Sequence, residues 1–235
     1  MGDIFLEIRN LSAWYSKNRM VLSDFSLELA EHEAVGLIGL NGAGKTTFLK
    51  ALSGLLSTCR AEEIRFRGRP AAVRDRAFKK ARYTVFDEDH SFGYFTFWEY
   101  LAYVFAAYGQ KQPDVSGLVK GFQFGDYGNV LLKDLSTGNR KKVFLITAFA
   151  LKPELLLLDE PVNGLDFQST EYLYEQIAGY RKYGTVLFSS HILESITLTS
   201  DRVCVLEGGG IRRTFERGQM DAARIREALH DESGI

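Results

Sequence analysis

The stretch Gly39-Leu40-Asn41-Gly42-Ala43-Gly44-Lys45-Thr46-Thr47 decides the fold. It fits the pattern G-x-x-x-x-G-K-[ST] of a phosphate-binding loop. The apolar run at residues 34–38 predicts a strand buried on both faces directly before it, and we expect a helix from residue 44 to about 55. Such a loop turns backbone N–H groups and the positive end of a helix toward phosphate oxygens. The sequence therefore predicts that residues 41–47 bind a nucleotide.

Two side chains of this loop have separate expected roles. The Lys45 ammonium is long enough to reach the β- and γ-phosphates, and the Thr46 hydroxyl is the expected Mg²⁺ ligand. The predicted cofactors are therefore a nucleotide and Mg²⁺.

Two acids follow another buried strand, in Leu155-Leu156-Leu157-Leu158-Asp159-Glu160-Pro161. We expect Asp159 to hold Mg²⁺ through water beside Thr46. Glu160 is expected to polarise the water that attacks the γ-phosphate. The acid pair and the phosphate loop together predict hydrolysis of the nucleotide.

The rest of the chain predicts an α/β fold with a helical insertion. We expect further strands at residues 4–9, 25–29, 64–66, 185–189 and 202–206, and helices at 166–182 and 192–198. Strands that alternate with helices after residue 155 indicate a parallel sheet. We expect one domain, 1–235, in which residues 1–86 and 151–218 form the core, 87–150 a helical subdomain and 219–235 a C-terminal helix or tail.

Composition narrows the function. The chain is 46% hydrophobic and 25% charged, which is typical of a globular protein, and its net charge of −1 gives no basic excess for nucleic acid. Its two cysteines, Cys59 and Cys204, lack the spacing of a disulfide framework or a zinc site, which favours a reducing, cytoplasmic setting. No segment has the ~20 apolar residues of a membrane span, and the N-terminus lacks the pattern of a signal peptide. We therefore expect any membrane role to be peripheral.

Further motifs, in the same order along the chain, resemble those of the ATP-binding cassette (ABC) ATPases. Leu135-Ser136-Thr137-Gly138-Asn139 looks like the family signature L-S-G-G-Q, and 163–166 resembles the family's D-loop. His191, just after a predicted strand, is similar to the switch histidine, and Tyr15 to the aromatic residue that stacks on adenine. Trp14 is adjacent and offers an alternative ring. The resemblance covers residues 3–215. It implies a P-loop NTPase core with an N-terminal antiparallel β subdomain, and it implies that the nucleotide is ATP.

The resemblance also implies how the site works. Two such domains meet head to tail, so Ser136 and the Gly138 N–H would cap the γ-phosphate held by the other chain. Asp166 would lie at that interface. His191 would contact the γ-phosphate and orient Glu160 and water. The expected second subunit is an identical chain.

Two departures from the family pattern affect this reading. The family has a Mg²⁺-binding glutamine where this chain has Asp87 or Glu88, and either carboxylate is a candidate for that role. Thr137 and Asn139 replace a glycine and a glutamine of the signature, and Thr137 adds bulk where backbone approaches phosphate. We therefore predict weak hydrolysis by the isolated chain and stimulation by a membrane partner.

That partner is expected to be an integral-membrane permease. Eleven of the chain's aromatic residues lie within residues 83–108, and the segment from Phe92 to Tyr108 is where such ATPases receive a permease helix. The same rings are equally suited to form the core of the helical lobe, and different faces can do both. The compact lobe and Glu160-Pro161-Val162-Asn163-Gly164-Leu165-Asp166 resemble bacterial ABC-2-type exporters of drugs, peptides, lipids or polysaccharides.

The resemblance leaves two other classes of function open. One is a soluble ABC ATPase of an assembly or regulatory system, and the other is a structural subunit that binds ATP and hydrolyses it slowly. For the transporter subunit, the expected location is the inner face of the cell membrane, as a peripheral protein.

Overall fold

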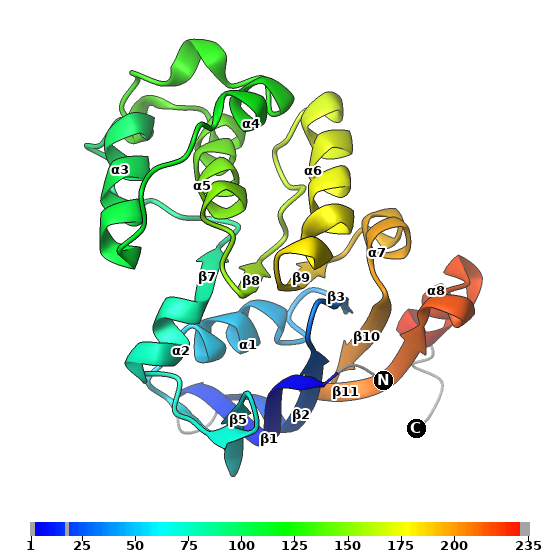
Figure 1. Cartoon of the computed structure of the whole chain (residues 1–235). Coiled ribbons are helices and arrows are strands. Elements are labelled where there is room, and N and C mark those ends of the chain that lie inside the picture. Colours follow the sequence, from blue (N-terminus) through cyan, green and yellow to red (C-terminus); the bar gives the residue numbers. More distant parts are fainter. Residues whose placement is uncertain (1–2, 17–18, 231–235) are drawn as a thin grey trace.

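Two β-sheets and their covering helices build the molecule, of which the computed structural model describes residues 3–16 and 19–230 (Figure 1). The strands are β1 (Ile4–Ser16), β2 (Arg19–Ala30), β3 (Ala34–Ile38), β4 (Cys59–Arg60), β5 (Glu63–Phe66), β6 (Arg69–Pro70), β7 (Arg82–Val85), β8 (Leu155–Leu158), β9 (Thr185–Ser190), β10 (Arg202–Glu207) and β11 (Gly210–Glu216). The helices are α1 (Lys45–Leu52), α2 (Arg76–Ala81), α3 (Phe97–Tyr108), α4 (Ser116–Gly121), α5 (Thr137–Leu151), α6 (Phe167–Gly179), α7 (Leu193–Thr199) and α8 (Ala222–His230). Short 3-10 turns are η1 (Gly125–Tyr127), η2 (Leu132–Asp134), η3 (Tyr180–Lys182) and η4 (Arg217–Gln219).

The larger sheet has six strands in the order β11-β10-β3-β9-β8-β7. The strands from β10 to β7 pair in parallel, and β11 adds an antiparallel edge. The four leucines of β8 show why this sheet needs continuous apolar runs. Leu155 and Leu157 face one hydrophobic core, while Leu156 and Leu158 face the other. Both faces of the strand are buried, as expected for a parallel sheet covered by helices.

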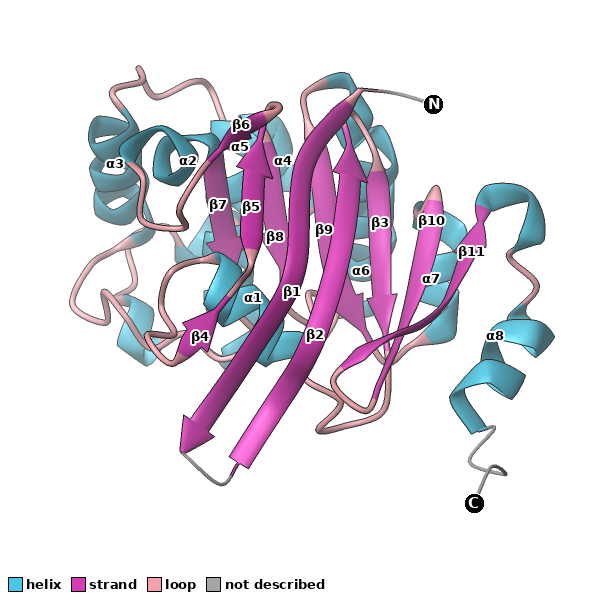
Figure 2. Ribbon diagram, turned by 90° about the horizontal axis from the view of Figure 1, so that it is seen from below, coloured by secondary structure: helices cyan, strands magenta, loops and turns pink. Residues whose placement is uncertain are grey.

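The smaller sheet is antiparallel, with the order β2-β1-β5-β6 and with β4 also paired to β1. Helix α1 lies between the two sheets (Figures 1 and 2), because Phe48, Leu49 and Leu52 pack into the core that joins them. The N-terminus of α1 is thereby fixed at the end of β3, between the sheets.

Helices fill the segment between β7 and β8. Helices α3, α4 and α5 lie together at the side of the parallel sheet opposite to β1 and β2 (Figure 1). Helix α3 begins with a capping box, in which Thr96 and Glu99 bond each other's backbone N–H groups, and Gly109 ends it in a left-handed conformation. Among the described residues, this segment contributes only an isolated bridge between Thr96 and Leu131 to any β-structure.

The predicted fold class is confirmed: a parallel core, an antiparallel N-terminal sheet and a helical insertion. The strands predicted at 4–9 and 25–29 are longer, because β1 and β2 continue to pair through several register shifts. The sequence reading missed β7, β11 and α2. Strand β7 is short and begins with the buried charge of Arg82, and β11 is a charged edge strand, so neither shows a long apolar pattern. The domain boundaries stay a prediction, and residues 231–235 of the predicted tail lie outside the described residues.

Within residues 3–16 and 19–230, no helix combines the length and the hydropathy that crossing a bilayer requires.

Candidate active site

The loop after β3 leaves the first turn of α1 open to a ligand. The first bond of the helix runs from the Phe48 N–H to the Gly44 carbonyl, at 2.8 Å. The N–H groups of residues 45–47 precede it, and no described side chain caps them. Unsatisfied N–H groups at a helix N-terminus attract anions. The first turn is therefore built to receive a phosphate.

Two glycines shape the loop for different reasons. Gly44 has a φ of 111°, and a Cβ there would lie 2.6 Å from Leu22 Cδ2. Gly42 has a φ of 86°, and a Cβ there would meet nothing within 4 Å. Both glycines are thus favoured by their positive φ. Gly44 in addition packs against the Leu22 side chain, whereas Gly42 lies beside open space.

A cavity of about 800 Å³ opens over this loop. Strands β1 and β2, the loop after β8 and the turn after β10 supply its other walls. Its lining residues are Tyr15, Arg19, Met20, Val21, Asn41, Gly42, Ala43, Gly44, Lys45, Thr46, Thr47, Asp87, Glu160, Asn163, His191, Gly208 and Gly209. The structure therefore brings the predicted loop, Tyr15, Glu160 and His191 to one cavity.

Lys45 joins the loop to the acid pair. Its side chain is buried, and Nζ donates to the Gly39 carbonyl at 2.7 Å and lies 3.5 Å from Glu160 Oε1. The Gly39 carbonyl and the Glu160 carboxylate thus hold the ammonium at the cavity. A phosphate oxygen can accept a further hydrogen bond from it, or take the place of one of these partners.

Thr46 and Asp159 form a pair of oxygen ligands. The Thr46 hydroxyl donates to Asp159 Oδ1 at 3.1 Å, and the Ser189 hydroxyl donates to the same oxygen at 2.8 Å. Burial raises the pKa of Asp159, an effect that these two hydroxyls oppose and the neighbouring Glu160 reinforces. A hydroxyl and a buried carboxylate suit a hard cation, so these residues fit Mg²⁺.

Glu160 is held at both ends. Its N–H donates to Ser189 Oγ at 2.9 Å, and its Oε2 accepts from the His191 N–H at 3.2 Å and lies 2.8 Å from His191 Nδ1. Its φ of 45° is left-handed, a conformation that costs a non-glycine residue roughly 1 kcal/mol. A strained residue with both ends fixed beside the phosphate loop is placed to orient a water molecule.

The ring of Tyr15 lies at the rim of the cavity. It is half exposed, and its hydroxyl lies 3.4 Å from Thr47 Oγ1. Among the described residues that line the cavity, Trp14 is absent. The geometry favours Tyr15 over Trp14 as the ring that a base can stack on.

The signature residues lie elsewhere. Ser136 caps α5 by accepting from the Asn139 N–H at 3.2 Å. A Cβ on Gly138 would lie 2.1 Å from the Gly164 carbonyl oxygen, so this glycine is required by the close approach of two loops. In the part of the chain that the structure describes, neither Ser136 nor Gly138 lines the cavity.

Asp166 also has partners outside the cavity. It caps α6 by accepting from the Ser169 N–H at 2.9 Å, and Lys142 Nζ donates to it at 2.5 Å. Partial burial acts to raise the pKa of Asp166, but the bonds from Lys142 and Ser169 outweigh it and lower this pKa to about 2. Asp166 is thus a fixed negative charge in the loop that contacts Gly138.

Comparison with known proteins identifies the family. The model of the ABC transporter family matches residues 22–163. This chain belongs to the ABC transporter family. It is 33% identical over 224 residues to AlbC of Bacillus subtilis (strain 168), covering 91% of this chain and 92% of AlbC. It is 30% identical over 207 residues to the lantibiotic transport ATP-binding protein SrtF of Streptococcus pyogenes, covering 88% of each.

A solved ABC structure shares the fold over nearly the whole length. The ATP-binding subunit of an ABC transporter superposes with a TM-score of 0.81 at 27% identity, covering 96% of this chain and 94% of that one. The predicted family is therefore confirmed: this ABC protein is the ATP-binding, ATP-hydrolysing subunit of a membrane transporter.

The structure of the ABC ATPase adds residues that the sequence reading missed. Ser189 links both acids, and its place beside His191 in Ser189-Ser190-His191 was the signal that could have found it. Arg19 and Met20 line the cavity from the start of β2, a segment that carries no motif. Lys141 contacts the site from α5, hidden within the basic run that follows the signature.

The structure also separates Asp87 from Glu88. Asp87 lines the cavity, whereas Glu88 is exposed and, among the described residues, takes no part in the lining. Both carboxylate oxygens of Asp87 have partners, since Lys141 Nζ donates to Oδ1 and Asn163 Nδ2 donates to Oδ2. Whether Asp87 binds Mg²⁺ stays a prediction.

Proposed function

We propose that two copies of this ABC ATPase bind two MgATP head to tail and couple hydrolysis to a separate permease that exports its substrate. The observation that carries the proposal is the division of the site. One chain assembles the phosphate loop, Glu160 and His191 around a cavity, while its own Ser136 and Gly138 face elsewhere. A second chain in the head-to-tail arrangement supplies the missing cap.

The chemistry follows from the contacts in one chain. Mg²⁺, when bound at Thr46 and Asp159, neutralises charge on the phosphate oxygens. Lys45 supplies a further positive charge to the γ-phosphate. Glu160 accepts a hydrogen bond from the attacking water, and His191 fixes the Glu160 carboxylate in that orientation. The contact between Glu160 and His191 favours an active hydrolase over a structural subunit with slow turnover.

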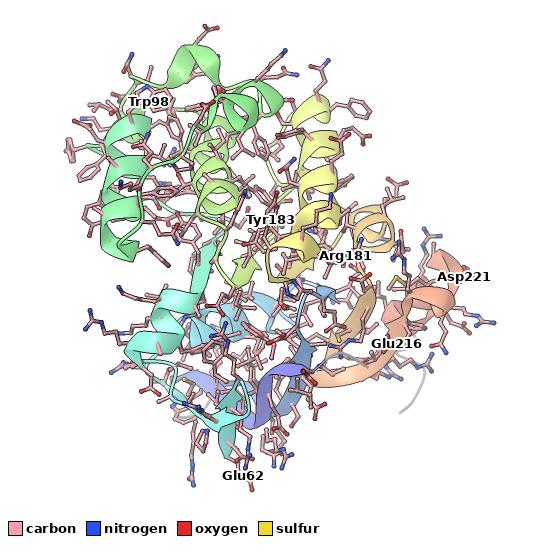
Figure 3. All side chains as sticks on the ribbon, viewed as in Figure 1. Glu62, Trp98, Arg181, Tyr183, Glu216 and Asp221 are labelled. Atoms are coloured by element: carbon pink, nitrogen blue, oxygen red, sulfur yellow. The ribbon has the colours of Figure 1, made fainter. Side chains whose placement is uncertain are left out.

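The aromatic segment supports docking of the permease on the helical lobe. Phe97, Tyr100 and Phe105 are buried in the core of the lobe, so the rings do serve packing. Tyr94 is 79% exposed and Tyr103 is 50% exposed. Trp98 is also partly exposed, and Figure 3 shows it at the end of α3 that lies away from the two sheets. Exposed aromatic rings are the side chains that most often anchor a protein interface. Docking there would hold the ATPase at the inner face of the membrane.

A peptide substrate has its support in a relative. SrtF carries lantibiotic transport in its name, and the alignment covers 88% of both chains. We infer that the substrate class includes such peptides. The export direction rests on the resemblance of the compact lobe and of residues 160–166 to ABC-2-type exporters.

Trapping the dimer tests the proposal. Glu160→Gln is expected to bind ATP without hydrolysing it, and with ATP and Mg²⁺ the chain should then run at twice its own mass in light scattering. Ser136→Arg in the same background should keep the chain monomeric, because the arginine blocks the cap over the partner's nucleotide. Binding of a fluorescent ATP analogue to the monomer should stay unchanged.

Either of two results would contradict the proposal. One is dimerisation of the double variant to the same extent as Glu160→Gln, and the other is weaker nucleotide binding by the monomer when it carries Ser136→Arg.

Recovery of the permease tests the docking surface. Tagged chain added to detergent-solubilised membranes should retain an integral protein, and Tyr94→Glu with Tyr103→Glu should lose it while the ATP affinity of the isolated chain is unchanged. Retention of the same protein by both forms would remove the helical lobe from the interface.

A further inference from the structure

A buried lysine outside the predicted site touches the catalytic loop. The Lys141 side chain is only 2% exposed, and it extends from the first turns of α5. Its Nζ donates to the backbone carbonyl of Glu160 at 3.0 Å and also to Asp87 Oδ1. A buried ammonium is stable only when it is paired and hydrogen-bonded, and here both requirements are met by residues around the nucleotide cavity.

Asp87 extends the contact to the next loop. Asn163 Nδ2 donates to Asp87 Oδ2 at 3.1 Å, so each oxygen of this carboxylate has one partner. The chain Glu160–Lys141–Asp87–Asn163 therefore joins the end of β7, the start of α5 and the loop after β8. Asp87 is 36% exposed, so its charge is held at the wall of the cavity.

The contact falls on the strained residue of the site. Glu160 has a φ of 45°, and its carbonyl faces the lysine while its N–H bonds Ser189. A change in the peptide plane of this residue would redirect the carboxylate that His191 holds. Misplacement of a catalytic group by about 1 Å can lower a rate 10²-fold.

We propose that Lys141 and Asp87 form an ion pair that positions Glu160. In this proposal the pair takes the place of the glutamine that the family has where this chain has Asp87 or Glu88. The proposal rests on the role of Glu160 in the proposed function. In it, Asp87 is the counter-ion of Lys141, and Mg²⁺ is left to Thr46 and Asp159.

The pair also has a consequence for coupling. Lys141 lies on the helix that Ser136 caps, so one rigid helix connects the signature to the Glu160 carbonyl. When a second chain's nucleotide engages Ser136, any movement of α5 reaches Glu160 through one side chain.

Four variants of the full chain test the pair. They are Lys141→Met, Asp87→Asn, the double variant, and Lys120→Met as the control, an exposed lysine on α4. Lys141→Met keeps the apolar stem and leaves Asp87 without its counter-ion. The readouts are kcat, KM, the affinity for a fluorescent ATP analogue, and the Mg²⁺ concentration that supports half of that binding.

A positioning role predicts a split between turnover and binding. Lys141→Met should lower kcat by at least ~10-fold and change nucleotide affinity by less than ~3-fold. The double variant should stay within ~3-fold of Lys141→Met, because it lacks the same donor to the Glu160 carbonyl. Asp87→Asn should leave the half-saturating Mg²⁺ concentration unchanged, and Lys120→Met should match the parent.

Three results would overturn the inference. One is a Lys141→Met variant whose kcat equals that of the parent. Another is a double variant that regains the kcat of the parent, which would assign the loss in Lys141→Met to the unpaired Asp87 carboxylate. The third is a higher half-saturating Mg²⁺ concentration in Asp87→Asn than in the parent, which would make Asp87 a metal ligand. Melting temperatures equal to that of the parent exclude unfolding as the cause of any loss. Glu160→Gln measured in parallel separates the two proposals: if it is inactive while Lys141→Met is normal, only the inference fails, and if it hydrolyses ATP at the parent rate, the proposed function fails with it.

Discussion

Two loops of this ABC ATPase lead into helix N-termini, and they are built in opposite ways. The loop before α1 ends in Gly44, has no described side-chain cap, and opens into a cavity of about 800 Å³. The loop before α5 is capped by its own Ser136, and its Gly138 packs against the Gly164 carbonyl. The first loop lines a cavity within one chain. The second is a packed junction, and in the proposed dimer it meets the nucleotide that the other chain holds.

The largest expected effect is a loss of ATP hydrolysis caused by a substitution at the first loop. Lys45→Ala should lower ATP hydrolysis by at least ~100-fold, because a buried ammonium directed at the phosphates is lost. Steady-state hydrolysis and binding of a fluorescent ATP analogue measure it. Lys50→Ala, on the last turn of the same helix, is the matched control and should hydrolyse ATP as the parent does. A normal rate in Lys45→Ala would mean that the loop does not hold the triphosphate.

A glycine from each loop sharpens the comparison. Gly138→Ala should destabilise the chain by about 2 kcal/mol, since its Cβ would lie 2.1 Å from a backbone oxygen that must shift. Gly42→Ala should cost only about 1 kcal/mol, for its left-handed φ of 86°, because nothing lies within 4 Å. Urea unfolding compares the two. Equal losses would show that the signature glycine is not selected by packing.

The buried carboxylate of Asp159 is expected to lower the stability of the chain while it supports ATP hydrolysis. Since burial raises its pKa in the folded chain, the ionised form is disfavoured and stability falls as pH rises through that pKa. At pH 7 Asp159→Asn should therefore melt a few degrees higher than the parent in the absence of nucleotide, and hydrolyse ATP far more slowly. Thermal scans with and without MgATP measure both effects. A lower melting temperature without nucleotide would contradict the expectation.

The smallest effect concerns the second loop. Asp166 has a folded pKa of about 2, below its ordinary 3.8, so its contribution to stability is present above pH 3.8 and is lost as pH falls toward 2. The carboxylate is 48% exposed, so we expect less than about 1 kcal/mol. The parent should exceed Asp166→Asn in urea resistance at pH 7, and the difference should shrink by pH 3. A difference that is constant with pH would assign the effect to the cap and not to the charge.

The helical lobe shows how far the sequence reading went. Its aromatic residues were expected to form a core, a docking surface or both, and the structure divides them within α3: Phe97 and Tyr100 are buried, while Tyr103 is half exposed. The sequence showed that these aromatic residues lie in a helical segment. The direction of each ring depended on where α5 packs, which is a contact between segments far apart in the chain.

Asp87 and Lys141 show where sequence reasoning stopped. The missing glutamine was visible, but the lysine lies 54 residues away, in a basic run that looks like a solvated surface. Only packing decides that Lys141 points inward while its neighbours Arg140 and Lys142 reach other partners.

The order and spacing of short motifs determined the family, the fold class and the phosphate site, because backbone geometry at a strand–loop–helix junction is a local property that nine residues can encode. Tertiary structure alone decided which carboxylate faces which ammonium. It also decided that the loop before α1 lines the cavity and that the loop before α5 does not. Those contacts join segments that only the packed sheets and helices bring together, and their energies depend on burial that no local pattern records.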